Sequence, residues 1–372
     1  KTLAPVELTI PVMQNLIKRA GIDPVIIDDV IWGCNYQRTY KENNLARVAA
    51  VKAGLPVTVP GITIHRNCTS SMSAIQMGFY QIRAGEAECI MAGGSDSMST
   101  APHMVFNARY GQKYGHMEMR DSMWDSLTNL GVGPAMGITA ENVADKYDIT
   151  REQMDAYSLR SQQRAVAAID AGRFEEEIVP VTVKSRKSET VYTVDEYPKR
   201  NATLEGLQKL KPAFKEGGKV TAGNASGMND ASSGVILMSE EKAKELGCPI
   251  MAKVVSVATT GVEPELMGIG PISSTKKALE KAGLTVDDID LFEINEAFSS
   301  QCLACQKELG VPDEKLNVNG GGISLGHPVG ATGSRIVITL MYELKRRKQR
   351  YGVATLCAGG GMGTTVVIEM CE

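Results

Sequence analysis

The sequence predicts an α/β fold made of two similar halves, with a long insertion in the first half. Short apolar segments typical of buried strands alternate with amphipathic helical segments along most of the chain. Two landmarks recur at nearly equal spacing, because Ala20-Gly21 reappears as Ala282-Gly283 after 262 positions and Ala92-Gly93 as Ala358-Gly359 after 266. Between residues 98 and 228 the sequence is richer in charge, methionine and polar loops, which indicates an inserted subdomain.

The first half opens with a helical pattern and continues with alternating strands and helices. Val6, Ile10, Met13 and Ile17 keep helical spacing, and Gly21 ends the pattern. The elements expected after it are a buried strand at 25–33, a helix at 45–54, a strand at 58–65, a helix at 67–85 and a short strand at 89–92.

The insertion contains a predicted helical pair and a loop of small residues. The helices are expected at 137–147 and 150–171, and Thr150 and Gln153 form a capping box that opens the second. The loop at 221–227 either lets a nucleotide or pantetheine chain approach the backbone or is a plain connection.

A second α/β unit follows the insertion. A strand expected at 235–239 leads to it, and its own expected elements are a strand at 289–293 and helices at 297–309 and 334–345. We therefore expect an N-terminal half at 1–97 that is completed by 229–247, an insertion at 98–228 and a C-terminal half at 248–372.

Composition and charge exclude several classes of protein. The formal net charge of the 372 residues is −3, so nothing favours nucleic-acid binding, and no apolar run or signal peptide indicates a membrane protein. The eight cysteines lie mostly in apolar segments, which indicates free thiols in a reducing compartment. We expect the cytoplasm, or an organelle matrix if a segment is missing ahead of Lys1. Cys302 and Cys305 lie within a helical pattern, which favours core packing over a metal or redox role, and no metal is implied.

The stretch from Asn317 to Arg335 carries the strongest signal. Six glycines lie between Gly320 and Gly333, which indicates left-handed turns or backbone against a ligand. His327 is followed by Pro328, which favours a histidine held at a turn before a helix. A tight strand-to-helix connection around a hydrogen-bonded histidine is the alternative.

Cys68 is the best candidate for a nucleophile. It stands at the start of the helix expected at 67–85, where the positive end of the helix dipole lowers the pKa of a thiol. A small buried core cysteine is the alternative. If the two halves face each other, the helix that carries Cys68 lies beside the loop that carries His327, because ligand sites gather at strand ends and domain junctions.

Two further reactive groups follow predicted strands of the second half. Asn295 begins the motif Asn-Glu-Ala-Phe, and Cys357 begins Cys-Ala-Gly-Gly-Gly-Met-Gly. Two cysteines, one histidine and one asparagine at strand ends suit acyl transfer, in which one thiolate takes an acyl group and a second thiol moves a proton.

These motifs together resemble the thiolase family over essentially the whole length. Asn-Glu-Ala-Phe (295–298), Gly-His-Pro-x-Gly-Ala-x-Gly (326–333) and Cys-x-Gly-Gly-Gly-x-Gly (357–363) occur in the family's order, with Asn-x-x-Gly (317–320) and the loop at 221–227. The resemblance implies a thiolase fold with duplicated βαβ halves in a layered αβαβα arrangement. It also implies thiolysis of 3-ketoacyl-CoA, or condensation of two acetyl-CoA, through an acyl-cysteine, and a homotetramer or homodimer. Coenzyme A thioesters are then substrates, and no cofactor is implied.

The resemblance also implies a role for each reactive residue. Cys68 is acylated, His327 activates it, and Cys357 removes or returns the α-proton of the second acyl-CoA. His327 and Asn295, the latter through a water, form one oxyanion hole, and the backbone N–H groups of Cys68 and Gly359 form the other. The positions that match the CoA and pantetheine channel are Leu127, Met136, Phe214, Ala222, Ser226, Met267, Ala297 and Phe298.

The chain departs from the family pattern in three places. It has no first strand and arginine-bearing loop ahead of the opening helix. Ala135 stands where short-chain biosynthetic members carry a histidine, as in longer-chain degradative members, and Asn67-Cys-Thr-Ser-Ser71 replaces the usual Cys-Gly-Ser-Gly. A decarboxylating β-ketoacyl synthase of the same architecture is the main alternative function, but it needs no second cysteine, so Cys357 argues against it.

Overall fold

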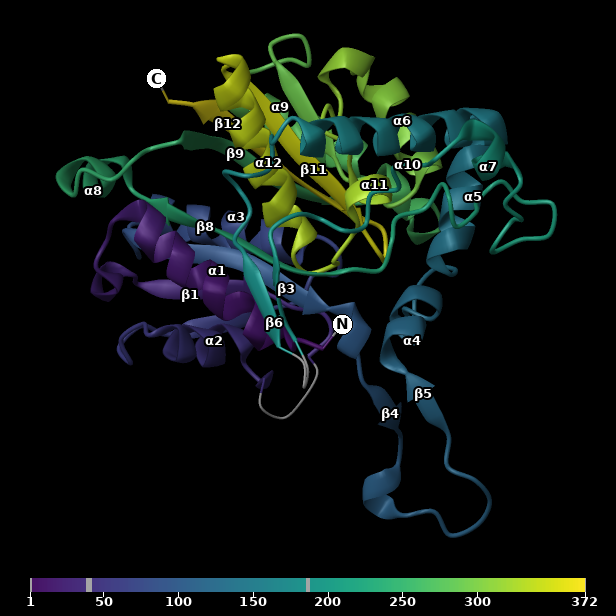
Figure 1. The fold of residues 1–372 in the computed structure, drawn as a ribbon, viewed down its shortest axis with the longest axis horizontal. Helices are drawn as coiled ribbons and strands as arrows, with labels where there is room; N and C mark the ends of the chain where they lie inside the picture. Colours follow the sequence, from purple (N-terminus) through teal and green to yellow (C-terminus); the bar gives the residue numbers. More distant parts are fainter. Residues whose placement is uncertain (1, 38–41, 185–187, 372) are drawn as a thin grey trace.

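A computed structural model describes residues 2–37, 42–184 and 188–371 of the chain, which form two four-stranded sheets and the helices around them (Figure 1). The first sheet has the order β2-β1-β3-β8, with β8 antiparallel to β3 and the other neighbours parallel. The second has the order β10-β11-β12-β9, in which only β10 and β11 are parallel. The strands are β1 (Asp29–Gly33), β2 (Gly61–Ile64), β3 (Cys89–Ser97), β8 (Asp230–Met238), β9 (Ala252–Gly261), β10 (Leu291–Ile294), β11 (Tyr351–Ala358) and β12 (Met362–Met370).

Three layers of helices enclose these two sheets. Helices α1 (Pro5–Ala20) and α2 (Leu45–Ala53) cover the outer face of the first sheet, where their apolar faces pack around Trp32. Helices α3 (Ser70–Arg83) and α12 (Thr332–Arg347) lie between the sheets, and α9 (Gly270–Ala282) and α10 (Ser299–Leu309) cover the outer face of the second. The layered αβαβα architecture that the sequence predicts is therefore confirmed.

The duplication is visible in the order of the strands. In each sheet a parallel pair is followed by an antiparallel strand, so β1, β3 and β8 correspond to β10, β11 and β12. The second sheet continues with β9, whereas no strand among the described residues pairs with the outer edge of β8.

The predicted elements are present, with two informative shifts at their starts. The strand expected from residue 25 begins at Asp29, because Pro24–Ile26 form a 3-10 turn. The helix expected from residue 67 begins at Ser70, so Cys68 lies in the turn before the helix. Asn67 has φ of 46°, a left-handed conformation that asparagine tolerates better than most residues.

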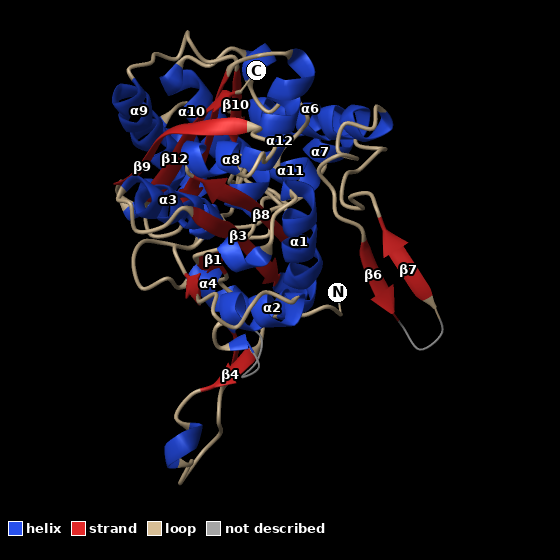
Figure 2. Ribbon diagram, turned by 90° about the vertical axis from the view of Figure 1, so that its left-hand side faces the viewer, coloured by secondary structure: helices blue, strands red, loops and turns tan. Residues whose placement is uncertain are grey.

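Residues between β3 and β8 form helices beside the second sheet and two projecting hairpins (Figure 2). Helix α5 packs against α10, and the β4–β5 arm extends away from the body of the molecule (Figure 1).

The remaining helices and strands, from this segment and from the rest of the chain, are β4 (His103–Val105), β5 (Met119–Asp121), α4 (Ser122–Thr128), α5 (Met136–Lys146), α6 (Arg151–Asp170), β6 (Val181–Lys184), β7 (Glu189–Tyr192), α7 (Leu204–Gln208), α8 (Glu240–Glu245) and α11 (Gly322–Leu325). The division of the chain at 98, 228 and 248 stays a prediction.

No helix in the described ranges is both long enough and apolar enough to cross a bilayer.

Candidate active site

The turn that carries Cys68 is tied to the glycine loop that follows Cys357. Within the turn, Ser70 Oγ donates to the carbonyl of Asn67 at 2.7 Å and accepts from Arg66 N at 2.9 Å. The Asn67 side chain then donates from Nδ2 to the carbonyl of Gly359 at 2.8 Å. The backbone N–H groups of Gly359 and of Cys68 itself face the Cys68 sulfur. Two donors are therefore already directed at the atom that would bear an acyl group.

The expected lowering of the Cys68 pKa is wrong. Burial raises the pKa of this thiol to about 11, and the N–H groups of Gly359 and Cys68 oppose the increase only in part. The helix dipole falls off within the first turn of a helix, and α3 begins two residues after Cys68. Cys68 is therefore a neutral thiol at rest, and its nucleophilic form requires a base.

His327 is suited to be that base. Its Nδ1 lies 2.7 Å from Thr332 Oγ1, and the Thr332 hydroxyl donates to the carbonyl of Pro328 at 2.8 Å. Because the hydroxyl proton is used on Pro328, the hydroxyl accepts from Nδ1–H, which leaves Nε2 as the acceptor. Burial, and next the positive charge of Arg335, lower the pKa of His327 from 6.5 to about 4, so the imidazole is neutral near pH 7.

A change in pH tests this assignment through stability. Between pH 6.5 and about 4 the unfolded chain binds a proton on His327 that the native state does not, so native stability falls as the pH falls through this window. Between pH 7 and pH 5 the free energy of unfolding should therefore fall by about 2 kcal/mol more in the wild type than in His327→Gln, as measured by urea denaturation. Identical pH slopes for the variant and the wild type would contradict a depressed pKa.

Asn295 and Cys357 complete the set at the ends of β10 and β11. Asn295 Nδ2 lies 3.4 Å from Nδ1 and 3.5 Å from Nε2 of His327, and its Oδ1 is buried with no hydrogen-bond partner among the described residues. Cys357 is fully buried, and burial, followed by the proximity of Cys68, raises its pKa well above the usual value. Cys357 is therefore a neutral thiol near the Cys68 sulfur.

The halves meet at these residues, as the duplicated pattern predicts. Cys68 packs against a cluster that includes Val329 of the His327 loop, and Ser334 at the start of α12 donates its N–H to Ser71 Oγ at 3.0 Å. A Cβ on Gly333 would lie 2.5 Å from Met72 N, so only glycine permits this approach of α12 to α3.

Glu296 is a buried carboxylate to which the sequence assigned no role. Its four partners among the described residues all donate: Tyr157 Oη at 2.9 Å and Asn317 Nδ2 at 3.0 Å to Oε1, and Ser161 Oγ at 2.6 Å and Ile323 N at 3.1 Å to Oε2. The network joins α6 to the glycine loop and holds the residue next to Asn295. The available signal was an acidic residue just after the largely apolar strand that ends at Ile294 and next to Asn295.

The structure brings most of the predicted CoA-channel residues together. Ser226 N donates to the carbonyl of Ala297 at 2.9 Å, and the rings of Phe214 and Phe298 meet edge to face with centroids 6.4 Å apart. Ala222 lies exposed on the same loop as Ser226. The five that share one apolar cluster with Cys357 are Leu127, Met136, Met267, Ala297 and Phe298.

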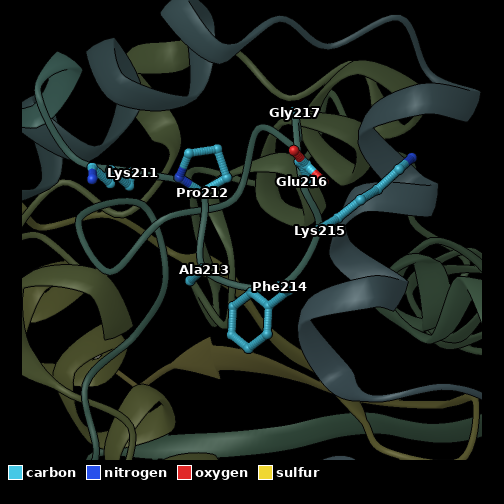
Figure 3. Close-up of a pocket in the computed structure, with 7 residues that line it drawn as sticks. All are labelled: Lys211, Pro212, Ala213, Phe214, Lys215, Glu216 and Gly217. Atoms are coloured by element: carbon cyan, nitrogen blue, oxygen red, sulfur yellow. The ribbon is translucent and has the colours of Figure 1, made fainter.

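A recess of about 370 Å³ is lined by residues 211–217 (Figure 3). Phe214 belongs both to the recess and to the ring pair with Phe298. The recess therefore borders the apolar cluster that contains Cys357.

Family models match nearly the whole chain: Thiolase, N-terminal domain, over residues 1–241, and Thiolase, C-terminal domain, over residues 248–370. This chain belongs to the thiolase family. It is 50% identical to an acetyl-CoA acetyltransferase of Syntrophomonas wolfei, over 99% of this chain and 94% of the relative.

Solved thiolase structures agree with the family assignment. A crystal structure of the Bacillus anthracis acetyl-CoA acetyltransferase is 48% identical with a TM-score of 0.97, over 100% of this chain and 94% of that one. Human mitochondrial 3-ketoacyl-CoA thiolase in complex with CoA is 42% identical with a TM-score of 0.96, over 100% and 93%. These matches support thiolase activity, and they do not support the decarboxylating synthase.

Proposed function

We propose that this thiolase cleaves 3-ketoacyl-CoA with CoA, and condenses two acetyl-CoA in reverse, through an acyl group on Cys68. The observation that carries the proposal is the meeting of a half-buried thiol, two backbone N–H groups directed at its sulfur, a neutral histidine and a second, fully buried thiol. The names of the relatives support the substrate class, because they include acetyl-CoA acetyltransferases and a 3-ketoacyl-CoA thiolase bound to CoA.

The first half-reaction uses the neutral forms of Cys68 and His327. Nε2 takes the thiol proton, and the thiolate attacks the 3-keto carbon of the substrate. The N–H groups of Cys68 and Gly359 hold the resulting oxyanion. The bond between C2 and C3 then breaks, which leaves an acyl group on Cys68 and the enolate of acetyl-CoA.

The second thiol supplies the proton that this enolate needs. The protonated Nε2 of His327 and a water held by the orphan Oδ1 of Asn295 stabilise the enolate oxygen. Cys357, kept neutral by burial, gives its proton to the α-carbon, and acetyl-CoA leaves. The Cys357 thiolate next takes the proton of incoming CoA, whose sulfur attacks the acyl group. Cys68 leaves and regains its proton from His327, and condensation follows the same steps backwards.

Steady-state assays with a panel of donors and substrates test the proposal. We expect thiolysis of acetoacetyl-CoA and condensation with acetyl-CoA as the donor, and condensation only with malonyl-CoA would overturn the thiolase mechanism. We also expect activity on a six-carbon 3-ketoacyl-CoA, because Ala135 places no polar side chain at the start of α5 beside Met136. Strict preference for acetoacetyl-CoA would contradict this second expectation.

The remaining proposals concern assembly, location and cofactors. The β4–β5 arm and the start of α4 expose large apolar side chains, which supports a homo-oligomer, a tetramer or dimer: Phe106, Tyr110, Tyr114, Met119 and Trp124. All eight cysteines are free, which supports a reducing compartment such as the cytoplasm. We propose no metal or cofactor, since the side chains named above account for every proton transfer.

A further inference from the structure

Asp96 is a buried carboxylate at the end of β3, outside the motifs that mark the active site. Its side chain is completely buried, and all of the partners found among the described residues are donors. Oδ1 accepts from the backbone N–H groups of Asn35 and Tyr36, both at 2.9 Å, and from Cys34 Sγ at 3.4 Å. Oδ2 accepts from Gly330 N at 2.5 Å and from Asn35 Nδ2 at 3.1 Å. One carboxylate therefore joins the segment after β1 to the loop that carries His327.

The same carboxylate reaches the turn that carries Cys68 through one intermediate. Asn35 Nδ2, which donates to Oδ2 of Asp96, also lies 3.3 Å from the carbonyl of Asn67, the residue before the nucleophile. Tyr36 and Val329, from the two segments that Asp96 holds, pack in one cluster beside Cys68. Asp96 is thus linked by hydrogen bonds to both segments that bring Cys68 and His327 together.

The packing around this link leaves little freedom. A Cβ on Gly330 would lie 2.7 Å from Asp96 Oδ2, and a Cβ on Gly94 would lie 2.0 Å from the Gly330 carbonyl. Gly330 therefore sits directly against β3 and its carboxylate. A small movement of Asp96 would move the His327 loop relative to the Cys68 turn.

We propose that Asp96 is a positioning residue that fixes the His327 loop relative to the Cys68 turn, so that the proton of Cys68 can pass to His327. This inference rests on the proposed function, because it concerns the geometry of acyl transfer to Cys68. Asp96 touches neither substrate nor reacting atoms. Asp96 belongs to the N-terminal half and His327 to the C-terminal half, so the link fixes the position of one half relative to the other at the site.

Asp96→Asn separates geometry from charge. The side chain of asparagine has only one acceptor oxygen. If that oxygen keeps the three contacts of Oδ1, the NH2 group takes the place of Oδ2 and faces the N–H of Gly330. Two donors cannot form a hydrogen bond, so the link to the His327 loop is broken. The charge of Asp96 raises the pKa of Cys68, so its removal alone would favour the thiolate and faster acylation. A change in the pKa of Cys68 would therefore not explain slower acylation.

The test is rapid-quench acylation of the full-length enzyme by acetyl-CoA, read by intact mass. We expect Asp96→Asn to acylate about 100-fold more slowly than wild type, with the Kd for CoA within about 2-fold. The control is Glu343→Gln, another buried carboxylate, held by Asn319 Nδ2 at 2.8 Å near the far end of α12, which we expect to acylate at the wild-type rate. A wild-type rate for Asp96→Asn, or equal losses in both variants, would overturn the proposal.

A second variant covers the case in which Asp96→Asn does not fold. Asn35→Ala keeps the bond from Gly330 to Asp96 and removes the connection to the Asn67 carbonyl. We expect slower acylation, and a double variant no slower than Asp96→Asn, because both changes break one link. Wild-type acylation by Asn35→Ala, or losses that multiply, would overturn the link. No acyl group on wild-type Cys68 would instead overturn the proposed function, together with the inference built on it.

Discussion

Cys68→Ala is expected to form no acyl-enzyme with acetyl-CoA and to lose thiolysis and condensation alike. The nucleophile takes part in both half-reactions. In covalent catalysis the catalytic residues act as a unit, so removing the nucleophile removes nearly all of the rate enhancement that they provide together. We expect turnover to fall on the order of 10⁴-fold or more. Intact-mass detection of an added acetyl group, with steady-state rates of thiolysis, measures both effects.

A matched control comes from a second half-buried thiol. Cys248 packs at the edge of the core on the outer side of the first sheet, away from the residues around His327. Cys248→Ala should keep the acyl-enzyme and its rate of formation. An acetyl group that still appeared on Cys68→Ala, or that moved to Cys248, would show that the nucleophile is another residue.

The sequence could predict much of this site because its signals are local. Helical spacing placed α1 and α3, glycine motifs placed the loops after β11 and before α12, and the repeated Ala-Gly landmarks indicated that two halves face each other. Family motifs then assigned roles to Cys68, His327 and Cys357. Each of these motifs and landmarks spans only a few residues, so it can be recognised without the fold, even where the two copies of a landmark lie far apart in the chain.

What the sequence could not predict depends on burial and on contacts across the chain. The predicted effect of a helix dipole on Cys68 required α3 to begin at Asn67, whereas it begins at Ser70 and the surrounding core desolvates the thiol. Asp96 followed a predicted strand in a polar run, but its contact with Gly330 joins residues 234 positions apart. Burial and long-range contacts of this kind are decided by tertiary packing.

The neutral resting thiols account for the need for two cysteines. With its pKa raised to about 11, Cys68 would, in the proposed mechanism, be converted to a thiolate only as His327 takes its proton. The imidazolium formed in that step is then the donor available to the enolate oxygen, so it cannot also protonate carbon. The proposed mechanism therefore assigns the carbon-bound proton to a second thiol with a raised pKa, Cys357.

Cys357→Ala is therefore expected to separate the two half-reactions. Acetyl-CoA should still acylate Cys68, since the CoA thiolate can leave without help from Cys357, whereas condensation should fall by roughly 10²-fold to 10⁴-fold because no base removes the α-proton. Acetylated enzyme should accumulate in the variant, and the rate of acetoacetyl-CoA formation measures the loss.

Cys305→Ala is the control for loss of a buried thiol from this region. Cys305 is fully buried in α10, where its Sγ lies 3.4 Å from the carbonyl of Gly268, and its charge would influence Cys357. It faces no reacting atom in the proposed mechanism, so its loss should lower stability more than the condensation rate. The outcome that would contradict the mechanism concerns Cys357→Ala. If this variant kept a near-normal condensation rate, Cys68 and His327 alone would suffice for acylation and condensation, and Cys357 would be excluded as the base.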